Sequence, residues 1–122
     1  MKLKRTTKQK FKARKKPGVM NELEQWYWDT HIEPLLKSGD YTLGRYEAIK
    51  LRLADNTWYT PDFYVILKDG SGEFHETKGT FWHDDARAKF KIAADIFDEY
   101  TWKWVVIKGG KKARTIEKIE VI

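Results

Sequence analysis

The chain has 122 residues, no cysteine and a formal net charge of +6. This length suits one domain with its own hydrophobic core, and the lack of cysteine excludes disulfides and thiolate metal sites. No apolar run reaches the length of a membrane-spanning helix, and the N-terminus lacks the apolar segment of a secretory signal. We therefore expect a cytoplasmic protein with no membrane partner.

Positive charge is concentrated at the N-terminus. Residues 1–16 contain nine Lys or Arg and no acid, which leaves residues 17–122 with a net charge of −3. Such a segment buries too little apolar surface to fold alone, so we expect residues 1–18 to form a flexible basic arm ahead of a domain at residues 19–122. Neutralising nucleic-acid phosphates is the strongest use of this charge, although a solubilising tail has the same composition. The arm residues expected to bind DNA are Lys8, Lys10, Lys12, Arg14, Lys15 and Lys16.

The first regular element of the domain is a helix that begins after Asn21. Apolar residues follow at spacings of three and four, and Asn21 is a suitable N-cap. Glu22 and Glu24 in the first turn suit the helix dipole. Pro34 is expected to kink or end this helix, with the segment running on to residues 38–40.

Two strands are expected next. Residues 42–53 alternate in a pattern typical of a single long strand, and a turn at residues 54–57 leads to the strand that carries Asp62. Three basic residues on the long strand fit either a DNA-facing side or a solvated strand face: Arg45, Lys50 and Arg52.

Residues 57–78 are typical of a β-hairpin, because aromatic and β-branched residues flank a turn rich in Asp and Gly at residues 69–72. Side chains alternate along a strand, so Glu76 and Lys78 share one face while Thr77 points away. Asp62 follows a proline, a residue confined to strand edges, strand starts and bulges. An acid at such a point indicates a functional end of the sheet.

Asp62, Glu76 and Lys78 together have a specific chemical use. Mg²⁺ prefers oxygen ligands and is usually held by one or two carboxylates together with water and substrate phosphate. Asp62 and Glu76 would supply the carboxylates, and Lys78 would orient or deprotonate a water, or offset charge on the attacked phosphate. The set predicts metal-assisted phosphodiester hydrolysis. Each part alone has a plainer interpretation, since Glu-x-Lys is usually a solvated ion pair and Pro-Asp a turn.

The C-terminal part of the chain is expected to be a helix followed by two strands. The helix begins at Asp84 or Asp85, an apolar strand over residues 102–107 runs parallel to the strand of Glu76, and residues 115–122 form the last strand. This order predicts an α/β fold with a mixed sheet flanked by helices. Three basic residues of the helix fit either contacts with DNA phosphates or a charged outer face: Arg87, Lys89 and Lys91.

The loop before this helix contains Phe81, Trp82 and His83. The two aromatic residues fit stacking on an exposed base or burial over the helix, and His83 fits a substrate contact. His75 lies on the strand face opposite Glu76, so we expect it to pack or to lie at the surface rather than to bind a metal.

Three short blocks, at residues 59–63 (Tyr-Thr-Pro-Asp-Phe), 76–79 (Glu-Thr-Lys-Gly) and 84–87 (Asp-Asp-Ala-Arg), follow an acidic helix. In this order they resemble the PD-(D/E)XK nuclease superfamily. Within it they are similar to small phage endonucleases, including Holliday-junction resolvases of the endonuclease I type. The resemblance covers residues 20–107.

The resemblance implies a restriction-endonuclease-like mixed β-sheet core, dependence on Mg²⁺ with Mn²⁺ able to substitute, and a homodimer. It also implies a glutamate on the first helix that completes the metal site, for which the register favours Glu24 over Glu22. The expected substrate is branched DNA such as a Holliday junction, and a phage enzyme would act in the host cell cytoplasm. Two alternatives are another nuclease of this superfamily (a nickase, exonuclease or mismatch-type enzyme) and a non-catalytic DNA-binding protein whose acids pair with the basic residues of the second helix.

Overall fold

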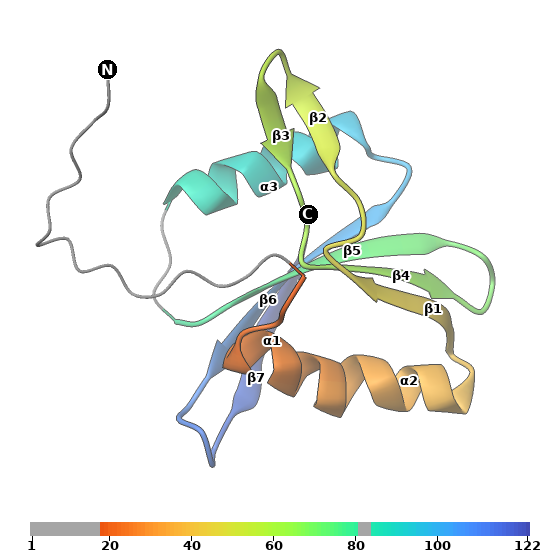
Figure 1. The fold of residues 1–122 in the computed structure, drawn as a ribbon, viewed down its shortest axis with the longest axis vertical. Coiled ribbons are helices and arrows are strands. Elements are labelled where there is room, and N and C mark those ends of the chain that lie inside the picture. The colour runs from red at the N-terminus through yellow and green to blue at the C-terminus, as the bar shows by residue number, and fades with distance from the viewer. Residues whose placement is uncertain (1–17, 81–83) are drawn as a thin grey trace, which may run out of the picture.

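The computed structural model describes residues 18–80 and 84–122. A mixed sheet of five strands lies between two helical layers, and a separate ribbon of two strands extends from it (Figure 1). This arrangement confirms the expected α/β class. Except for Gly18, the expected basic arm lies outside the described residues, as does the loop at residues 81–83.

The five strands lie in the order β1 (Tyr41–Tyr46), β4 (Phe63–Leu67), β5 (Gly72–Lys78), β6 (Thr101–Lys108) and β7 (Thr115–Val121). Neighbouring strands are antiparallel except β5 and β6, which are parallel. Helix α3 (Asp84–Ile96) lies in the chain between these two strands. The helix, the parallel strand and the last strand are therefore where the sequence predicts them.

The N-terminal helical segment runs as α1 (Glu22–Tyr27), a π-helical turn η1 (Trp28–Ile32) and α2 (Glu33–Ser38). Asn21 is the N-cap, and its side chain and that of Glu24 form a reciprocal capping box. Pro34 lies in the first turn of α2, where a missing N–H costs little, so the chain stays helical as far as Gly39. Pro34 does not end the helix, and the departure from α-helical geometry is the π turn that precedes it.

The prediction of one long strand over residues 42–53 is wrong. Strand β1 ends at Tyr46, and β2 (Leu51–Ala54) begins after a break. The break starts at Glu47, which has a φ of 47°, in the left-handed region, and donates its N–H to the carbonyl of Asp62 at 2.8 Å. The sheet ladder therefore cannot continue past this residue.

The strand expected to carry Asp62 is also broken, opposite Glu47. It consists of two strands, β3 (Thr57–Tyr59) and β4, with Thr60, Pro61 and Asp62 between them. Strand β1 pairs with β4 inside the main sheet, whereas β2 pairs with β3 in the ribbon that leaves it. Asp62 consequently lies between two strands rather than inside one.

Two cores lie on opposite faces of the sheet, because alternate residues of each strand point to opposite sides. On β6, Val105 and Ile107 face the α1–α2 layer, whereas Trp104 and Val106 face α3. Side chains of the ribbon pack against the α3 core, and contacts between α3 and both ribbon strands hold it in place. No helix in the described ranges is long and apolar enough to cross a membrane.

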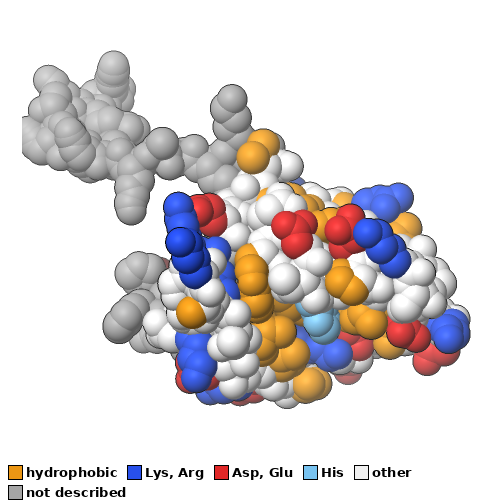
Figure 2. All heavy atoms as spheres, turned by 90° about the horizontal axis from the view of Figure 1, so that it is seen from below, with side chains coloured by type: hydrophobic (Ala, Val, Ile, Leu, Met, Phe, Trp, Pro, Cys, Tyr) orange, Lys and Arg blue, Asp and Glu red, His pale blue; other side chains and the backbone are white. Residues whose placement is uncertain are grey.

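The face of the molecule seen from below in Figure 1 carries a band of apolar side chains with a histidine among them (Figure 2). His31 of the π turn is partly buried and stacks on Tyr27 with ring centroids 4.8 Å apart. Its Nε2 is 3.3 Å from the hydroxyl oxygen of Tyr41 on β1. These contacts tie the helical layer to the sheet.

Candidate active site

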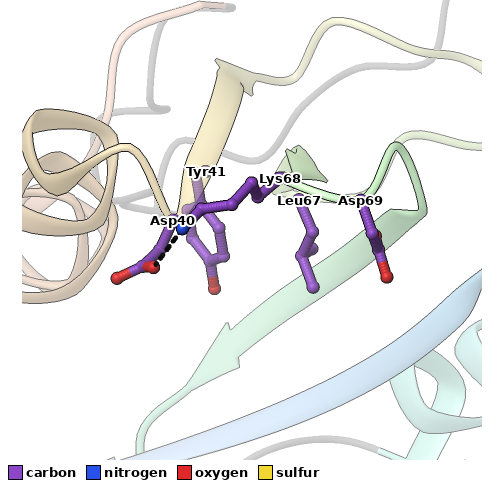
Figure 3. A pocket seen from close by; sticks show the side chains of 5 residues that line it. All are labelled: Asp40, Tyr41, Leu67, Lys68 and Asp69. Carbon is purple, nitrogen blue, oxygen red and sulfur yellow. Dashed lines mark ion pairs between the residues drawn. The ribbon is translucent and has the colours of Figure 1, made fainter.

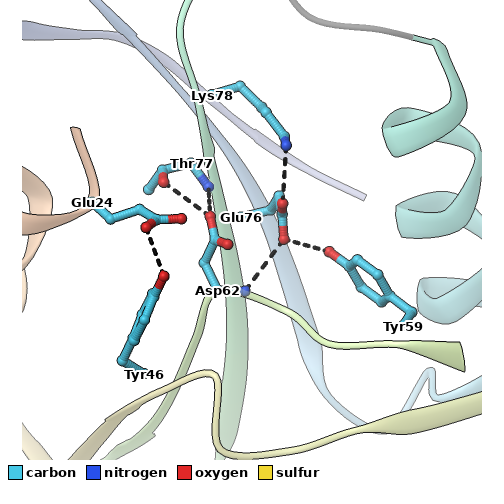
Figure 4. A network of polar contacts seen from close by, with 7 residues as sticks. All are labelled: Glu24, Tyr46, Tyr59, Asp62, Glu76, Thr77 and Lys78. Carbon is cyan, nitrogen blue, oxygen red and sulfur yellow. Dashed lines mark hydrogen bonds and ion pairs between the residues drawn. The ribbon is translucent and has the colours of Figure 1, made fainter. Parts of the chain in front are cut away.

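Asp62 directly precedes β4, at the end of the sheet where the antiparallel pairing of β4 with β5 stops. Phe63 pairs with His75, so residues 76–78 of β5 extend beyond β4. The carboxylate oxygen Oδ2 of Asp62 takes the place of a strand partner there, since it accepts the backbone N–H of Thr77 at 2.9 Å and the Thr77 hydroxyl at 3.0 Å (Figure 4). The break between β3 and β4 is thus what orients Asp62.

Glu76 is held by three donors. Its Oε1 accepts the Tyr59 hydroxyl at 2.5 Å and the backbone N–H of Asp62 at 3.3 Å, and its Oε2 is 3.3 Å from the ammonium of Lys78. Tyr59 reaches the site from the ribbon, whereas Glu76 and Lys78 lie on β5 (Figure 4). The structure therefore brings Asp62, Glu76 and Lys78 together.

A third carboxylate comes from helix α1. Oε1 of Glu24 accepts the backbone N–H of Asn21 at 2.9 Å and the Tyr46 hydroxyl at 2.7 Å. In Figure 4 the carboxylate of Asp62 lies between those of Glu24 and Glu76. Glu22 is exposed and pairs with Lys111 at 3.3 Å, so of the two glutamates it is Glu24 that lies at the site.

The three carboxylates are almost completely buried, with exposed fractions of 6% for Glu24, 7% for Asp62 and 6% for Glu76. Burial, followed by the charges of Glu76 and Glu24, raises the pKa of Asp62 well above its usual value. Burial also raises the pKa of Glu76, against the lowering effects of Lys78 and Tyr59. Among the described residues, Lys78 is the one cation that pairs with Glu76, and Asp62 forms no ion pair there. The two carboxylates of Asp62 and Glu76 therefore require a proton or a bound cation to balance their charge.

The oxygen atoms of the site fit Mg²⁺ or Mn²⁺. Within the described parts of the chain, Oδ1 of Asp62 receives no hydrogen bond and Oε2 of Glu76 contacts only Lys78. No group of three His, Cys, Asp or Glu side chains in residues 18–80 and 84–122 is arranged to hold a metal ion by itself. The three expected metal ligands, Asp62, Glu76 and Glu24, therefore do not form a metal-holding group by themselves. The Mg²⁺ site stays a prediction in which water and phosphate oxygens would complete the coordination, as is usual for Mg²⁺.

The basic residues of α3 do not form one cluster. Arg87 pairs with Glu120 of β7 at 2.6 Å and lies over the ring of Trp104, with its guanidinium carbon 5.0 Å from the centroid. Lys89 donates to the carbonyl of Trp58 at 3.2 Å, and Lys91 is exposed. Arg87 thus points towards β7 and Lys89 towards the ribbon.

Three residues that contact the acids have no role in the sequence analysis: Tyr46, Tyr59 and Thr77. Thr77 does leave the face of Glu76, as alternation predicts, but Asp62 approaches from that other side and bonds to it. Tyr59 lies three residues before Asp62 in the same sequence block, residues 59–63. This nearness to Asp62 is the one sequence feature that could have indicated that Tyr59 lies at the site. The role of Tyr46 depends on long-range packing against α1 and has no local signal.

A second buried polar cluster lies further along β5. The hydroxyl oxygen of Tyr27 is 2.7 Å from Nδ1 of His75, and Nε2 of His75 is 2.8 Å from Oε1 of Glu73. Lys103 pairs with the same Glu73 oxygen at 3.1 Å. His75 is fully buried and burial lowers its pKa, which confirms it as a packing residue.

A surface hollow lies at the opposite end of β4 from Asp62. It is lined by Asp40, Tyr41, Leu67, Lys68 and Asp69, with Lys68 and Asp40 3.7 Å apart (Figure 3). It contains none of the carboxylates described above, so the hollow and the acidic site are separate features.

Comparison of the sequence with models of known protein families gives no match. A comparison with curated proteins gives no significant match either. The likeness to PD-(D/E)XK nucleases therefore rests on the short sequence motifs alone and stays a prediction.

Proposed function

We propose that this chain is a metal-dependent DNA endonuclease with a restriction-endonuclease-like fold. The observation that carries the proposal is the buried pair of Asp62 and Glu76 at the open end of β4, with Lys78 3.3 Å from Glu76. Burying the carboxylates of Asp62 and Glu76 beside one lysine is unfavourable unless a cation or a proton joins them. A divalent cation that also binds a DNA phosphate fits both this charge and the uncompensated oxygens.

Each residue has a distinct role in the proposed reaction. Asp62 and Glu76 would hold the metal ion, with Glu24 as the outer acid, and the hydrogen bonds of Thr77 and Tyr59 fix the carboxylates of Asp62 and Glu76 respectively. When bound, Mg²⁺ supplies Lewis-acid activation of the scissile phosphate and of a water. Lys78 orients or deprotonates the attacking water, or stabilises negative charge that develops on the phosphate.

The proposed substrate is branched DNA, as in a Holliday junction, and the proposed active form is a homodimer. Both follow from the motif resemblance. The substrate also fits a small domain joined to a basic segment, since phosphate contacts position a protein on DNA without reading its sequence. Two sites related by a two-fold axis would cut opposing strands of such a junction.

A non-catalytic DNA-binding protein is disfavoured by the ion pairs of α3. In that alternative the acids would be neutralised by Arg87, Lys89 or Lys91. In the described part of the chain, Arg87 pairs with Glu120 and Lys89 bonds to a backbone carbonyl of the ribbon. None of the three forms an ion pair with Glu24, Asp62 or Glu76 in residues 18–80 and 84–122.

The test is cleavage of a labelled four-way junction and its matched linear duplex, with Mg²⁺ or EDTA. We expect wild-type protein to cut the junction in Mg²⁺ only, and Glu76→Gln to abolish cutting. Glu22→Gln is the matched control, because Glu22 is an exposed glutamate of the same chain that should tolerate the change. Equal cutting of both substrates would contradict the proposed preference for junctions. Tight binding of DNA without any cutting would contradict the proposed nuclease activity.

A further inference from the structure

The ribbon of β2 and β3 has one buried and one exposed face. Side chains of Leu51, Leu53 and Tyr59 pack against the core beneath α3. Arg52 and Trp58 are directly opposite each other in the ribbon and point to the other side. The Trp58 side chain is 44% exposed, which is a large aromatic surface to leave in water.

Basic side chains surround this tryptophan. The ammonium of Lys50 lies 4.9 Å from the centroid of the Trp58 ring, and Arg52 faces Trp58 across the ribbon, where it forms an ion pair with Asp55. Lys89 of α3 donates to the carbonyl of Trp58 at 3.2 Å. Lys50 thus lies over the exposed aromatic ring, Arg52 lies on the same ribbon face, and Lys89 holds the backbone of Trp58 from α3.

We propose that this exposed ribbon face binds a DNA strand, with an unpaired base stacked on Trp58 and the flanking phosphates on Lys50 and Arg52. This inference rests on the proposed function, because it names a second contact surface for the same substrate. Every nucleobase has a π-face, and aromatic side chains flanked by cations are the usual platform for single-stranded nucleic acid. Stacking of a base on an aromatic ring is also stronger than an exposed cation–π contact, so the base displaces Lys50 from the ring and frees it for a phosphate.

The ribbon connects this surface to the acidic site. Trp58 and Tyr59 are consecutive residues of β3 that point to opposite faces, and the Tyr59 hydroxyl donates to Glu76 at 2.5 Å. A strand anchored on Trp58 therefore lies beside the element that positions a metal ligand. A branch point that carries unpaired bases offers such a base, whereas a closed duplex does not, so the ribbon gives the site a physical basis for preferring branched DNA with unpaired bases over linear duplex.

The test measures binding by fluorescence anisotropy in EDTA, where no cleavage occurs. The probes are a labelled four-way junction with unpaired thymines at its branch point and the matched linear duplex, each titrated over a series of KCl concentrations. We expect Trp58→Ala to weaken junction binding about tenfold with an unchanged salt dependence, and to affect the duplex much less. Trp58→Phe retains a ring and should restore most of the affinity.

Lys50→Gln should instead lower the slope of log affinity against log salt by about 0.7–0.9, the value of one phosphate contact. Lys37→Gln is the matched control, because Lys37 is an exposed lysine of α2 on the other side of the sheet. It should leave both affinity and slope unchanged.

Two results would overturn the ribbon surface: unchanged junction binding in Trp58→Ala, or equal effects of Lys50→Gln and Lys37→Gln. The outcome is independent of catalysis. If the variants change binding as expected but the wild-type protein shows no metal-dependent cutting, the ribbon surface is supported and the nuclease activity is rejected. If Trp58→Ala cuts and binds normally, the nuclease activity is supported and the ribbon surface is rejected.

Discussion

Replacing Asp62 with asparagine should stabilise the metal-free protein while it removes the metal site. The asparagine side-chain oxygen can still accept hydrogen bonds from the N–H and the hydroxyl of Thr77, so both contacts that orient this residue are kept. The substitution deletes a buried acid whose ionisation is made unfavourable by burial and by the charges of Glu76 and Glu24. Ionising such a group costs about 1.4 kcal/mol for each unit by which its pKa is raised, so near neutral pH we expect a gain of about 2 kcal/mol, or roughly 8 °C in Tm for a domain of this size.

The pH dependence of this gain has a definite sign. The pKa of Asp62 is raised in the folded state, so the folded protein holds a proton that the unfolded chain releases at its usual pKa near 4. The contribution of Asp62 to the unfolding free energy therefore falls as the pH rises above about 4, by at most about 1.4 kcal/mol per pH unit for one proton, until the raised pKa is passed. The advantage of Asp62→Asn should be small at pH 4 and largest at pH 8.

Bound metal should reverse the order of stability. Mn²⁺ at a hundred times its Kd adds about 2.7 kcal/mol, or roughly 10 °C, to wild type and nothing to the variant. Thermal unfolding followed by circular dichroism, in EDTA or MnCl₂, measures both effects. Asp69→Asn is the control, because Asp69 is an exposed turn residue bonded to Ser71 and should leave the response to Mn²⁺ intact. If Asp62→Asn is less stable than wild type in EDTA and equally stabilised by Mn²⁺, the reasoning is refuted.

Three further substitutions test individual contacts. Tyr59→Phe removes a hydrogen bond that lowers the pKa of Glu76, so the acid side of the pH profile of cleavage should move to higher pH. Glu24→Gln removes a charge that raises the pKa of Asp62, so the pH at which Mn²⁺ binding is half lost, measured by calorimetry, should move down. Burial and then His75 lower the pKa of His31 to about 4, so the contribution of His31 to the unfolding free energy should fall as the pH falls from about 6.5 towards 4. Allowing for the partial exposure of His31, urea unfolding of wild type should lose about 1–2 kcal/mol more than His31→Gln over this range.

Local signals in the sequence predict most of the elements. The capping residue Asn21, the turn around Gly70 with its φ of 91°, and the apolar alternation of β6 depend on neighbouring residues, and all three appear where expected. The break in the strand over residues 42–53 could not be predicted in this way. It depends on the left-handed conformation of Glu47 and its bond to Asp62, while the alternation of side chains continues without a signal.

In the site, too, some features follow from local sequence and others depend on long-range contacts. The sequence motifs and the alternation of strand side chains predict that Asp62, Glu76 and Lys78 form one site, and the structure places the three residues together. Glu22 and Glu24 are two positions apart on a helix and so point in very different directions. The register favours Glu24, and it is Glu24 that the structure buries beside Asp62. The contact of Tyr59 with Glu76 depends on the ribbon folding back over α3, a tertiary event that local pattern does not encode.

The measurement that tests the account most directly is the anomalous scattering of Mn²⁺ in crystals of the wild-type protein. The account predicts a peak at the carboxylates of Asp62 and Glu76, and its loss in crystals of Asp62→Asn. A peak elsewhere, with Asp62 and Glu76 joined by a shared proton instead, would contradict the proposed metal site and with it the proposed nuclease.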